Sequence, residues 1–223
     1  MKKAISKSLF LITVILYQTL SSCSSDDSIL GSITGSNNIV TLSRELPSFS
    51  KIHAEGDLTI NIQQSSTQEV TINVNDNLQD VIITNVDNNT LFVSLRNGSY
   101  NNTTFELNIQ MPFLQEFQMN DDTQGKIDFV LDQLDIKINN SAQLELIGSS
   151  ESLNINLGDD SRIDGFLFAT TSLNANVQDD SELSITCNSE LNGSVSDDSI
   201  LRYKGSPVIN ATTSDDGEII NAN

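Results

Sequence analysis

Apolar and polar residues alternate with a period of two along most of the chain after Phe49. The first half contains four such runs, each bounded by Asn, Asp, Gly or Ser: Leu58-Ile60-Ile62, Val70-Ile72-Val74, Leu91-Val93-Leu95 and Phe105-Leu107-Ile109-Met111. Alternation over short runs between turn-forming residues indicates strands with one buried face. No comparable stretch has a helical period, and all three prolines lie between the runs, where a missing N–H does no harm. The pattern therefore predicts an all-β protein.

The second half carries an internal repeat, in which an alternating strand ends in a polar pair. Four copies begin at Leu134, Leu153, Leu173 and Leu191. Their polar pairs, with those of an earlier and a later copy, are Asp121-Asp122, Asn140-Ser141, Asp159-Asp160, Asp179-Asp180, Asp197-Asp198 and Asp215-Asp216. Successive pairs are 19, 19, 20, 18 and 18 residues apart, and a second apolar strand follows nearly every pair. The spacing defines a unit of 18 to 20 residues.

Such a unit cannot bury its apolar face alone, but it can when it is stacked on a copy of itself. We therefore predict a single-stranded, right-handed parallel β-helix, or β-solenoid, in which residues 153–157 of one rung pack over 173–177 of the next. The outward Asn154, Asn174 and Asn192 would form an asparagine ladder. Strand spacing alone would also permit a β-sandwich, whose strands recur about every 8 to 12 residues. The long-period repeat favours the solenoid.

The N-terminus has the parts of a secretory signal: a basic start, the apolar stretch Leu9–Leu16 and small residues before a cut. The apolar stretch is shorter than the roughly 20 residues of a membrane-spanning helix, so it should be cleaved. Leu20-Ser21-Ser22-Cys23 resembles a bacterial lipobox, in which Cys23 is lipidated and becomes the mature N-terminus. An ordinary signal peptide with an incidental cysteine is the alternative.

We expect four segments along the chain: a lipoprotein signal peptide over 1–22, the lipidated Cys23 with a flexible tether over 23–42, N-terminal strands over 43–112 and repeat rungs over 113–223, the last two forming one β-solenoid domain (43–223). The lipid would hold the protein to a membrane. The expected location is the cell envelope, as an outer-membrane lipoprotein that faces either the surface or the periplasm.

The net charge limits the classes of partner, and the cysteine content limits the covalent cross-links. All 30 acidic residues but only eight of the 11 basic ones follow Cys23, so the mature chain has a formal net charge of −22 (eight less 30). Such a surface repels nucleic acid and other polyanions. The remaining cysteine, Cys187, lies at an apolar position of a strand, which excludes a disulfide framework and predicts a small buried side chain.

Several segments resemble the opening of the putative auto-transporter adhesin, head GIN domain family: Ser43–Ile52, Gly56–Ile60, Val70–Val74, Asn77-Leu78 and Asn89–Leu91. The resemblance covers residues 43 to 221. It implies an exported Bacteroidetes protein, often a lipoprotein, with a solenoid-like β body. The family usually has small Gly-Ser-Gly-like residues at the repeated corner, where this chain has Asp-Asp-Ser.

The aspartate pairs are the only candidate site. The residues predicted as metal ligands are Asp121, Asp159, Asp160, Asp179, Asp180, Asp197, Asp198 and Asp215. Carboxylates stacked about 4.8 Å apart are hard oxygen ligands suited to Ca²⁺. Alternatively each Asp-Asp-Ser is a turn, in which one aspartate accepts backbone N–H bonds and Ser161, Ser181 or Ser199 supports the bend. No other cofactor is expected.

These features favour a non-enzymatic envelope lipoprotein that presents a solenoid surface for adhesion or ligand binding, with a host or cell-surface protein or a glycan as partner. A carbohydrate-active β-helix hydrolase or lyase is one alternative, because paired carboxylates perform glycoside hydrolysis. The single histidine, His53, lies far from the repeats and is expected to be a plain surface or edge residue. A calcium-stabilised structural spacer is the other alternative, and an uncapped solenoid end would permit end-to-end pairing.

Overall fold

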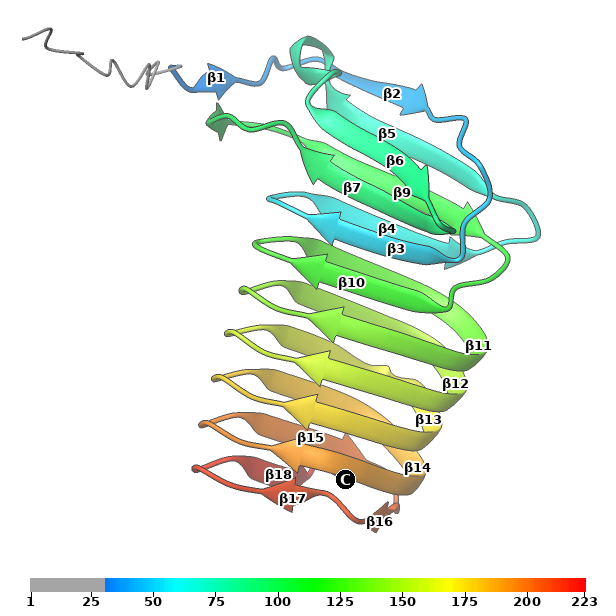
Figure 1. Ribbon diagram of the computed structural model, residues 1–223, viewed down its shortest axis with the longest axis vertical. Helices are drawn as coiled ribbons and strands as arrows, with labels where there is room; N and C mark the ends of the chain where they lie inside the picture. The colour runs from blue at the N-terminus through cyan, green and yellow to red at the C-terminus, as the bar shows by residue number, and fades with distance from the viewer. Residues whose placement is uncertain (1–30) are drawn as a thin grey trace, which may run out of the picture. The chain divides into compact units, whose positions relative to one another are not determined.

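A computed structural model describes residues 31–223, of which Ser32–Asn223 form one compact unit. Within this range the chain runs along a front face, turns a tight corner, returns along a rear face and bends round to begin again (Figure 1). The only helix in the described chain is one 3-10 turn, Asp76–Leu78, so no helix there is long enough to span a membrane. The prediction of an all-β solenoid with rungs of about 19 residues is confirmed.

The strands of the N-terminal half are short: β1 (Ile33–Thr34), β2 (Ile39–Ser43), β3 (Lys51–Glu55), β4 (Thr59–Gln64), β5 (Glu69–Asn75), β6 (Ile82–Asp87), β7 (Thr90–Leu95), β8 (Tyr100–Asn101), β9 (Phe105–Met111) and β10 (Glu116–Asn120). Four long bent strands follow: β11 (Gln124–Ile138), β12 (Gln143–Leu157), β13 (Arg162–Val177) and β14 (Glu182–Val195). The last strands are β15 (Ile200–Lys204), β16 (Val208–Ile209), β17 (Thr212–Thr213) and β18 (Glu218–Asn221).

Each long strand supplies both a rear pass and a front pass of the solenoid and pairs in parallel with the strands before and after it. In the front pass Leu153, Ile155 and Leu157 lie directly opposite Leu173, Ala175 and Val177, as predicted. All six side chains are buried. Full burial of such a side chain contributes about 1.5–3 kcal/mol for the larger ones, so stacked apolar columns between the two faces form the core.

The rung made of β3 and β4 lies away from its neighbours in sequence. Strand β3 pairs in parallel with β7 and β10, and β4 pairs in parallel with β9 and β11. This rung is therefore inserted between one made from residues 90–111 and one made from 116–131. Residues 43–112 are thus part of the same stack as the repeat rungs, and the segment 112–115 carries the chain past β3 to reach β10.

Pairing becomes antiparallel at the N-terminal end of the stack. On the rear face β5 pairs antiparallel with β9 and β2, and on the front face β6 pairs antiparallel with β7. Strand β1 pairs with β8. The flexible tether was predicted to extend to residue 42, but 33–34 and 39–43 form strands. Residues 33–34 pair with β8, and 39–43 extend the sheet at the edge of β5.

A glycine at the close approach of two rungs offers a test of the stacking. Gly193 has φ of 119°, and a Cβ there would lie 1.9 Å from the carbonyl oxygen of Ala175. We expect Gly193→Ala to lower the free energy of unfolding by about 2–4 kcal/mol, because strain and overpacking act together. Urea denaturation would measure it. In the control Gly158→Ala the nearest atom is 3.5 Å away, so the change should be small; equal losses in both variants would contradict the predicted close approach.

Candidate functional site

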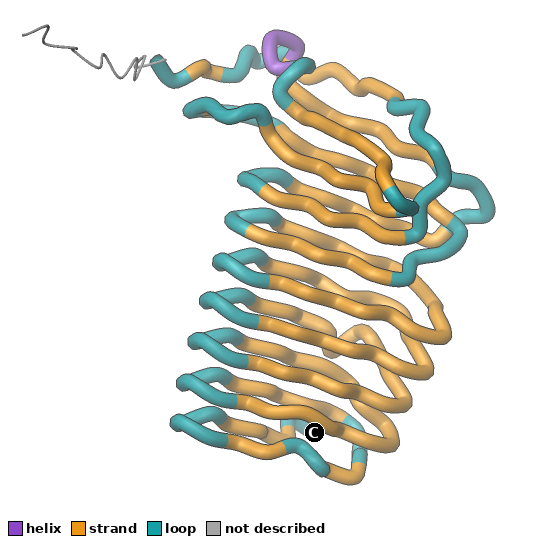
Figure 2. Tube along the Cα trace, viewed as in Figure 1, coloured by secondary structure: helices purple, strands orange, loops and turns teal. Residues whose placement is uncertain are grey.

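The predicted aspartates lie in the loops where the front pass turns into the rear pass. Figure 2 draws these loops in teal along one edge of the solenoid. At four successive corners both members of the pair are left-handed: Asp159-Asp160, Asp179-Asp180, Asp197-Asp198 and Asp215-Asp216 have φ between 46° and 60°. Asn140 and Ser141 are left-handed as well, and at the first corner Asp121 has φ of 59°. Asn and Asp tolerate this conformation better than other residues with a side chain. The backbone at each corner thus accounts for the recurring residue type.

The corners are joined by their backbones rather than by their carboxylates. The N–H of Asp160 donates to the carbonyl oxygen of Asp179 at 2.9 Å, and Asp180 donates to Asp197 at the same distance. Asp198 donates to Asp215 at 3.0 Å. The predicted turn is thus present, but a rung-to-rung backbone bond takes the place expected for an aspartate side chain. The carboxylates of the pairs are exposed to solvent.

The residue after each pair points inward and supports the bend. Ser161, Ser181 and Ser199 are buried. The N–H of Ser161 donates to the hydroxyl of Ser181 at 3.2 Å, and that of Ser181 donates to the hydroxyl of Ser199 at 3.0 Å. The Ser161 hydroxyl has no hydrogen-bond partner among the described residues. The serines therefore belong to the structural core of the corner.

The eight aspartates predicted as metal ligands are brought into one column along this edge. Within residues 31–223, however, no three His, Cys, Asp or Glu side chains converge to hold a metal ion. Calcium binding by the column stays a prediction. The predicted lipidation site Cys23 lies outside the described residues.

The other two residues singled out in the sequence are in plain environments. His53 lies on the front face, with its ring centroid 5.7 Å from that of Phe92 and its Nε2 3.0 Å from the side-chain nitrogen of Asn120. Cys187 is fully buried, its Sγ lies 3.1 Å from the carbonyl oxygen of Glu190, and burial raises the pKa of the thiol. Both match the structural roles predicted for them.

Two columns of polar side chains lie on the front face of the last four rungs, and only one of them was predicted from the sequence. The predicted column Asn154-Asn174-Asn192 is in register and continues to Asn210, while Asn156-Asn176-Ser194-Thr212 forms a second column beside it. Asn176 donates to Asn156 at 3.1 Å, Ser194 donates to Asn176 at 3.1 Å and Asn210 donates to Asn192 at 3.1 Å. We call these eight residues the asparagine array. The repeat itself, Leu-Asn-x-Asn, is the signal that could have revealed the second column.

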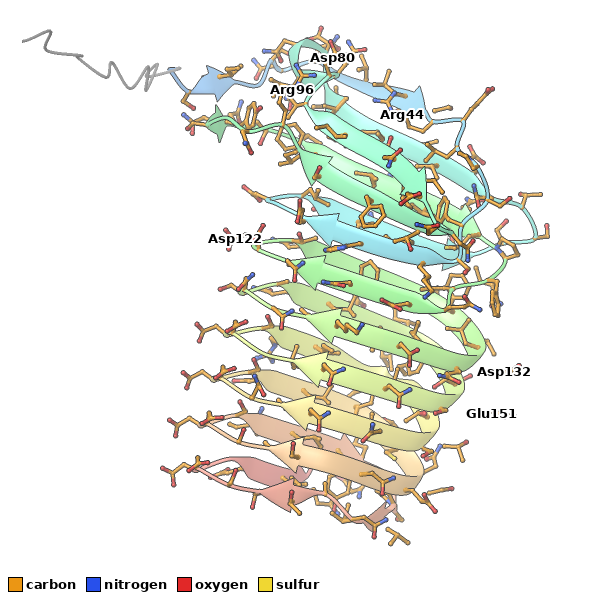
Figure 3. All side chains as sticks on the ribbon, in the orientation of Figure 1. Arg44, Asp80, Arg96, Asp122, Asp132 and Glu151 are labelled. Carbon is orange, nitrogen blue, oxygen red and sulfur yellow. The ribbon has the colours of Figure 1, made fainter. Side chains whose placement is uncertain are left out.

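The asparagine array contains no charge, although the chain carries 30 acidic residues. Nearer the N-terminus the same face carries ion pairs, with Glu116 lying 3.4 Å from Lys51 and 3.6 Å from Lys137. On the rear face Glu182 lies 2.6 Å from Arg162 and 3.2 Å from Arg202. Acidic side chains also mark the two edges, with Asp122 at the corner edge and Asp132 and Glu151 at the opposite bend (Figure 3). The array is therefore a neutral, polar patch on an acidic molecule.

Comparison with known proteins agrees with this architecture. The model of the family described as putative auto-transporter adhesin, head GIN domain, matches residues 48–207. The chain belongs to this family. No curated protein sequence matches it significantly. The family name and the descriptions of related structures indicate no enzyme.

Crystal structures of Bacteroidetes proteins share the fold. A putative adhesin from Bacteroides fragilis is 20% identical, with a TM-score of 0.67 over 85% of this chain and 99% of that one. A putative adhesin from Parabacteroides merdae is 16% identical, with a TM-score of 0.55 over 86% and 99%. A putative lipid binding protein from Parabacteroides distasonis is 17% identical, with a TM-score of 0.54 over 86% and 100%. At these identities the likeness shows the fold alone.

The corner geometry predicts how the aspartate column responds to neutralisation. We expect Asp179→Asn combined with Asp180→Asn to raise the midpoint of thermal unfolding at low salt by a few degrees. Asn keeps the left-handed turn and removes repulsion between neighbouring carboxylates, which is about 0.9 kcal/mol for each pair of charges at 4.8 Å in water.

Melts at fixed ionic strength in CaCl₂, MgCl₂ and EDTA would separate the two interpretations of the column. A midpoint that rises specifically with calcium, and does so less in the Asn variant, would establish the metal site, because a ligand of the folded state stabilises it.

Proposed function

We propose that this protein is a non-enzymatic binding protein of the cell envelope, anchored through Cys23, and that it adheres to neutral glycans through the asparagine array. The membership of a family named for adhesion supports the general role. The observation that carries the proposal is the absence of charge from a regular polar patch on a surface that is otherwise strongly acidic.

The array suits a partner with many hydroxyl groups. Each asparagine side chain has two N–H donors and a carbonyl acceptor, and a hydroxyl group both donates and accepts. The ladder bond to the next rung uses only part of that capacity, so the rest faces solvent. The bonds Asn156–Asn176, Asn176–Ser194 and Asn192–Asn210 hold these side chains in one arrangement, which lowers the entropic cost of binding.

Charge decides between classes of partner. An anionic polymer would be repelled by the surrounding carboxylates, and a cationic one would be drawn to the aspartate corners instead. A neutral polysaccharide is neither repelled by the carboxylates nor drawn away from the array to the aspartate corners. Rungs about 4.8 Å apart, with side chains about 6.7 Å apart along each strand, would offer it a regular lattice of amide groups.

Replacing amides of the array by carboxylates should weaken adhesion. We expect the wild-type chain to co-sediment with an insoluble neutral polysaccharide such as cellulose, chitin or curdlan. The double variant Asn174→Asp, Asn176→Asp should bind at least about tenfold more weakly, because it removes both amide donor groups and leaves carboxylates that can only accept. Co-sedimentation over a range of polymer concentrations would measure the affinity.

The matched control places the same two charges on the rear face, as Gln124→Glu and Gln143→Glu. These exposed amides lie directly opposite each other in the adjacent strands β11 and β12, and they are outside the array. The control should bind like the wild type. Equal loss in both variants, or no binding of any of the three polymers by the wild type, would contradict adhesion through the array.

The membrane anchor has its own test. We expect the wild-type protein, expressed with its signal in a bacterial host, to incorporate a labelled fatty acid and to partition into the detergent phase of Triton X-114. Cys23→Ala removes the only thiol at the proposed cut and should remove both signals, because several acyl chains on one residue are what hold a lipoprotein in a leaflet. Cys187→Ala serves as the control cysteine substitution. Labelling that persists in Cys23→Ala would exclude lipidation at this residue.

A further inference from the structure

A second polar surface lies at the bend edge, opposite the aspartate corners. It is a hollow of about 300 Å³ lined by Phe113, Gln115, Glu116, Asp132, Gln133 and Asp135, with Lys51 at its rim. Asp132 marks its position in Figure 3, on the side of the solenoid away from Asp122. The hollow touches the asparagine array, because Asn154 of the array donates to Asp135 at 2.6 Å.

The interleaved order of the rungs creates this hollow. After β9 the chain must pass the inserted strand β3 before it can begin β10, and it does so through residues 112–115. Leu114 anchors this crossover in the core. Phe113 beside it points outward and is 51% exposed, so the crossover holds an aromatic ring at the surface beside the polar bend of the next rung.

Two of the polar side chains around Phe113, Gln115 and Asp135, are held by hydrogen bonds to residues outside the hollow. Ser50 donates to the side-chain oxygen of Gln115 at 2.8 Å, so the amide N–H groups of Gln115 remain to donate elsewhere. Oδ1 of Asp135 accepts from Asn154 and, at 3.4 Å, from Gln133. Its Oδ2 and the carboxylate of Asp132 have no hydrogen-bond partner in the described chain.

We propose that this hollow binds one sugar ring of a glycan. The apolar face of the ring stacks on Phe113, hydroxyl groups donate to Asp132 and to Oδ2 of Asp135, and the Gln115 amide donates to a ring substituent. An aromatic surface flanked by a few fixed polar groups is what gives a small-molecule site both affinity and orientation. Glu116 is already neutralised by Lys51 and Lys137, so it stays outside this set.

The proposal shares its ligand class with the proposed function and deepens it, but the two sites can fail separately. The hollow is sized for one or two sugar rings, whereas the array spans four rungs and needs a polymer. A short oligosaccharide therefore tests the hollow, and an insoluble polymer tests the array.

The experiment is saturation-transfer NMR followed by titration calorimetry of the whole chain with cellotriose, maltotriose, xylotriose and triacetylchitotriose. We expect transfer to the ring protons of at least one trisaccharide. Phe113→Ala should weaken that binding at least about tenfold, as loss of a central aromatic contact does. Asp132→Asn, which alters one exposed side chain and no core contact, should weaken it severalfold.

The matched control is Phe92→Ala, since Phe92 is an exposed phenylalanine (41%) on the front face, outside the hollow. It should bind like the wild type. Binding unaffected by Phe113→Ala and Asp132→Asn, or no binding of any trisaccharide by the wild type, would overturn the proposal. If Phe113→Ala loses the trisaccharide while Asn174→Asp, Asn176→Asp retains it, the hollow binds sugar independently of the array.

Discussion

The parallel hydrogen-bonded ladder between rungs is the interaction on which the rest of the structure depends. A single rung has two short strands facing each other across a layer of apolar side chains, and it has no neighbour within itself to pair its backbone. Stacking pairs that backbone and covers the apolar layer together, residue over residue, as at Leu153 and Leu173. Neither contribution is available without the other, so the rung length must stay nearly constant along the stack. A rung that gains residues accommodates them outside the ladder, as β13 does at the irregularity between Gly165 and Ala169.

The same constraint decides what the surface can carry. From Asn140 onward each corner reverses the chain through two residues with left-handed backbone, which favours Asp and Asn and leaves their side chains in solvent. Each outward position of a strand must lie beside its copy in the next rung, where like charges would repel and amides can bond. The front face can therefore hold columns of asparagine, and the acidic residues gather at the corners, the bends and the ion pairs. The in-register stacking that buries the apolar core therefore also arranges the surface side chains in columns.

The repetitive part of the molecule could be predicted from the sequence, because the spacing of the polar pairs and the alternation of apolar residues are visible there. The steps between the polar pairs located every corner from residue 121 onward, and the aligned copies located the column Asn154-Asn174-Asn192, whereas the second column beside it was missed. The sequence could not predict that β3 and β4 are inserted between later rungs, since their alternation is the same whichever strands they pair with. Nor could it predict strands at 33–34 and 39–43, which depend on partners far along the chain. The hollow at Phe113 was missed for the same reason, because it joins a crossover to a bend that is distant in sequence.

The inserted rung also sets the order in which the chain can fold. Strands β3 and β4 lie early in the sequence, yet each needs a partner on both sides, and the last of these partners, in β11, ends its contact with β4 at Asp128. A chain that is synthesised N-terminus first must hold this rung with open edges until those residues appear. Closing it forms loops of about 60 residues, which is slow compared with the addition of later rungs to a finished neighbour. Completion of the inserted rung is therefore expected to be the slow step of folding. The remaining rungs can then add one after another to a finished neighbour.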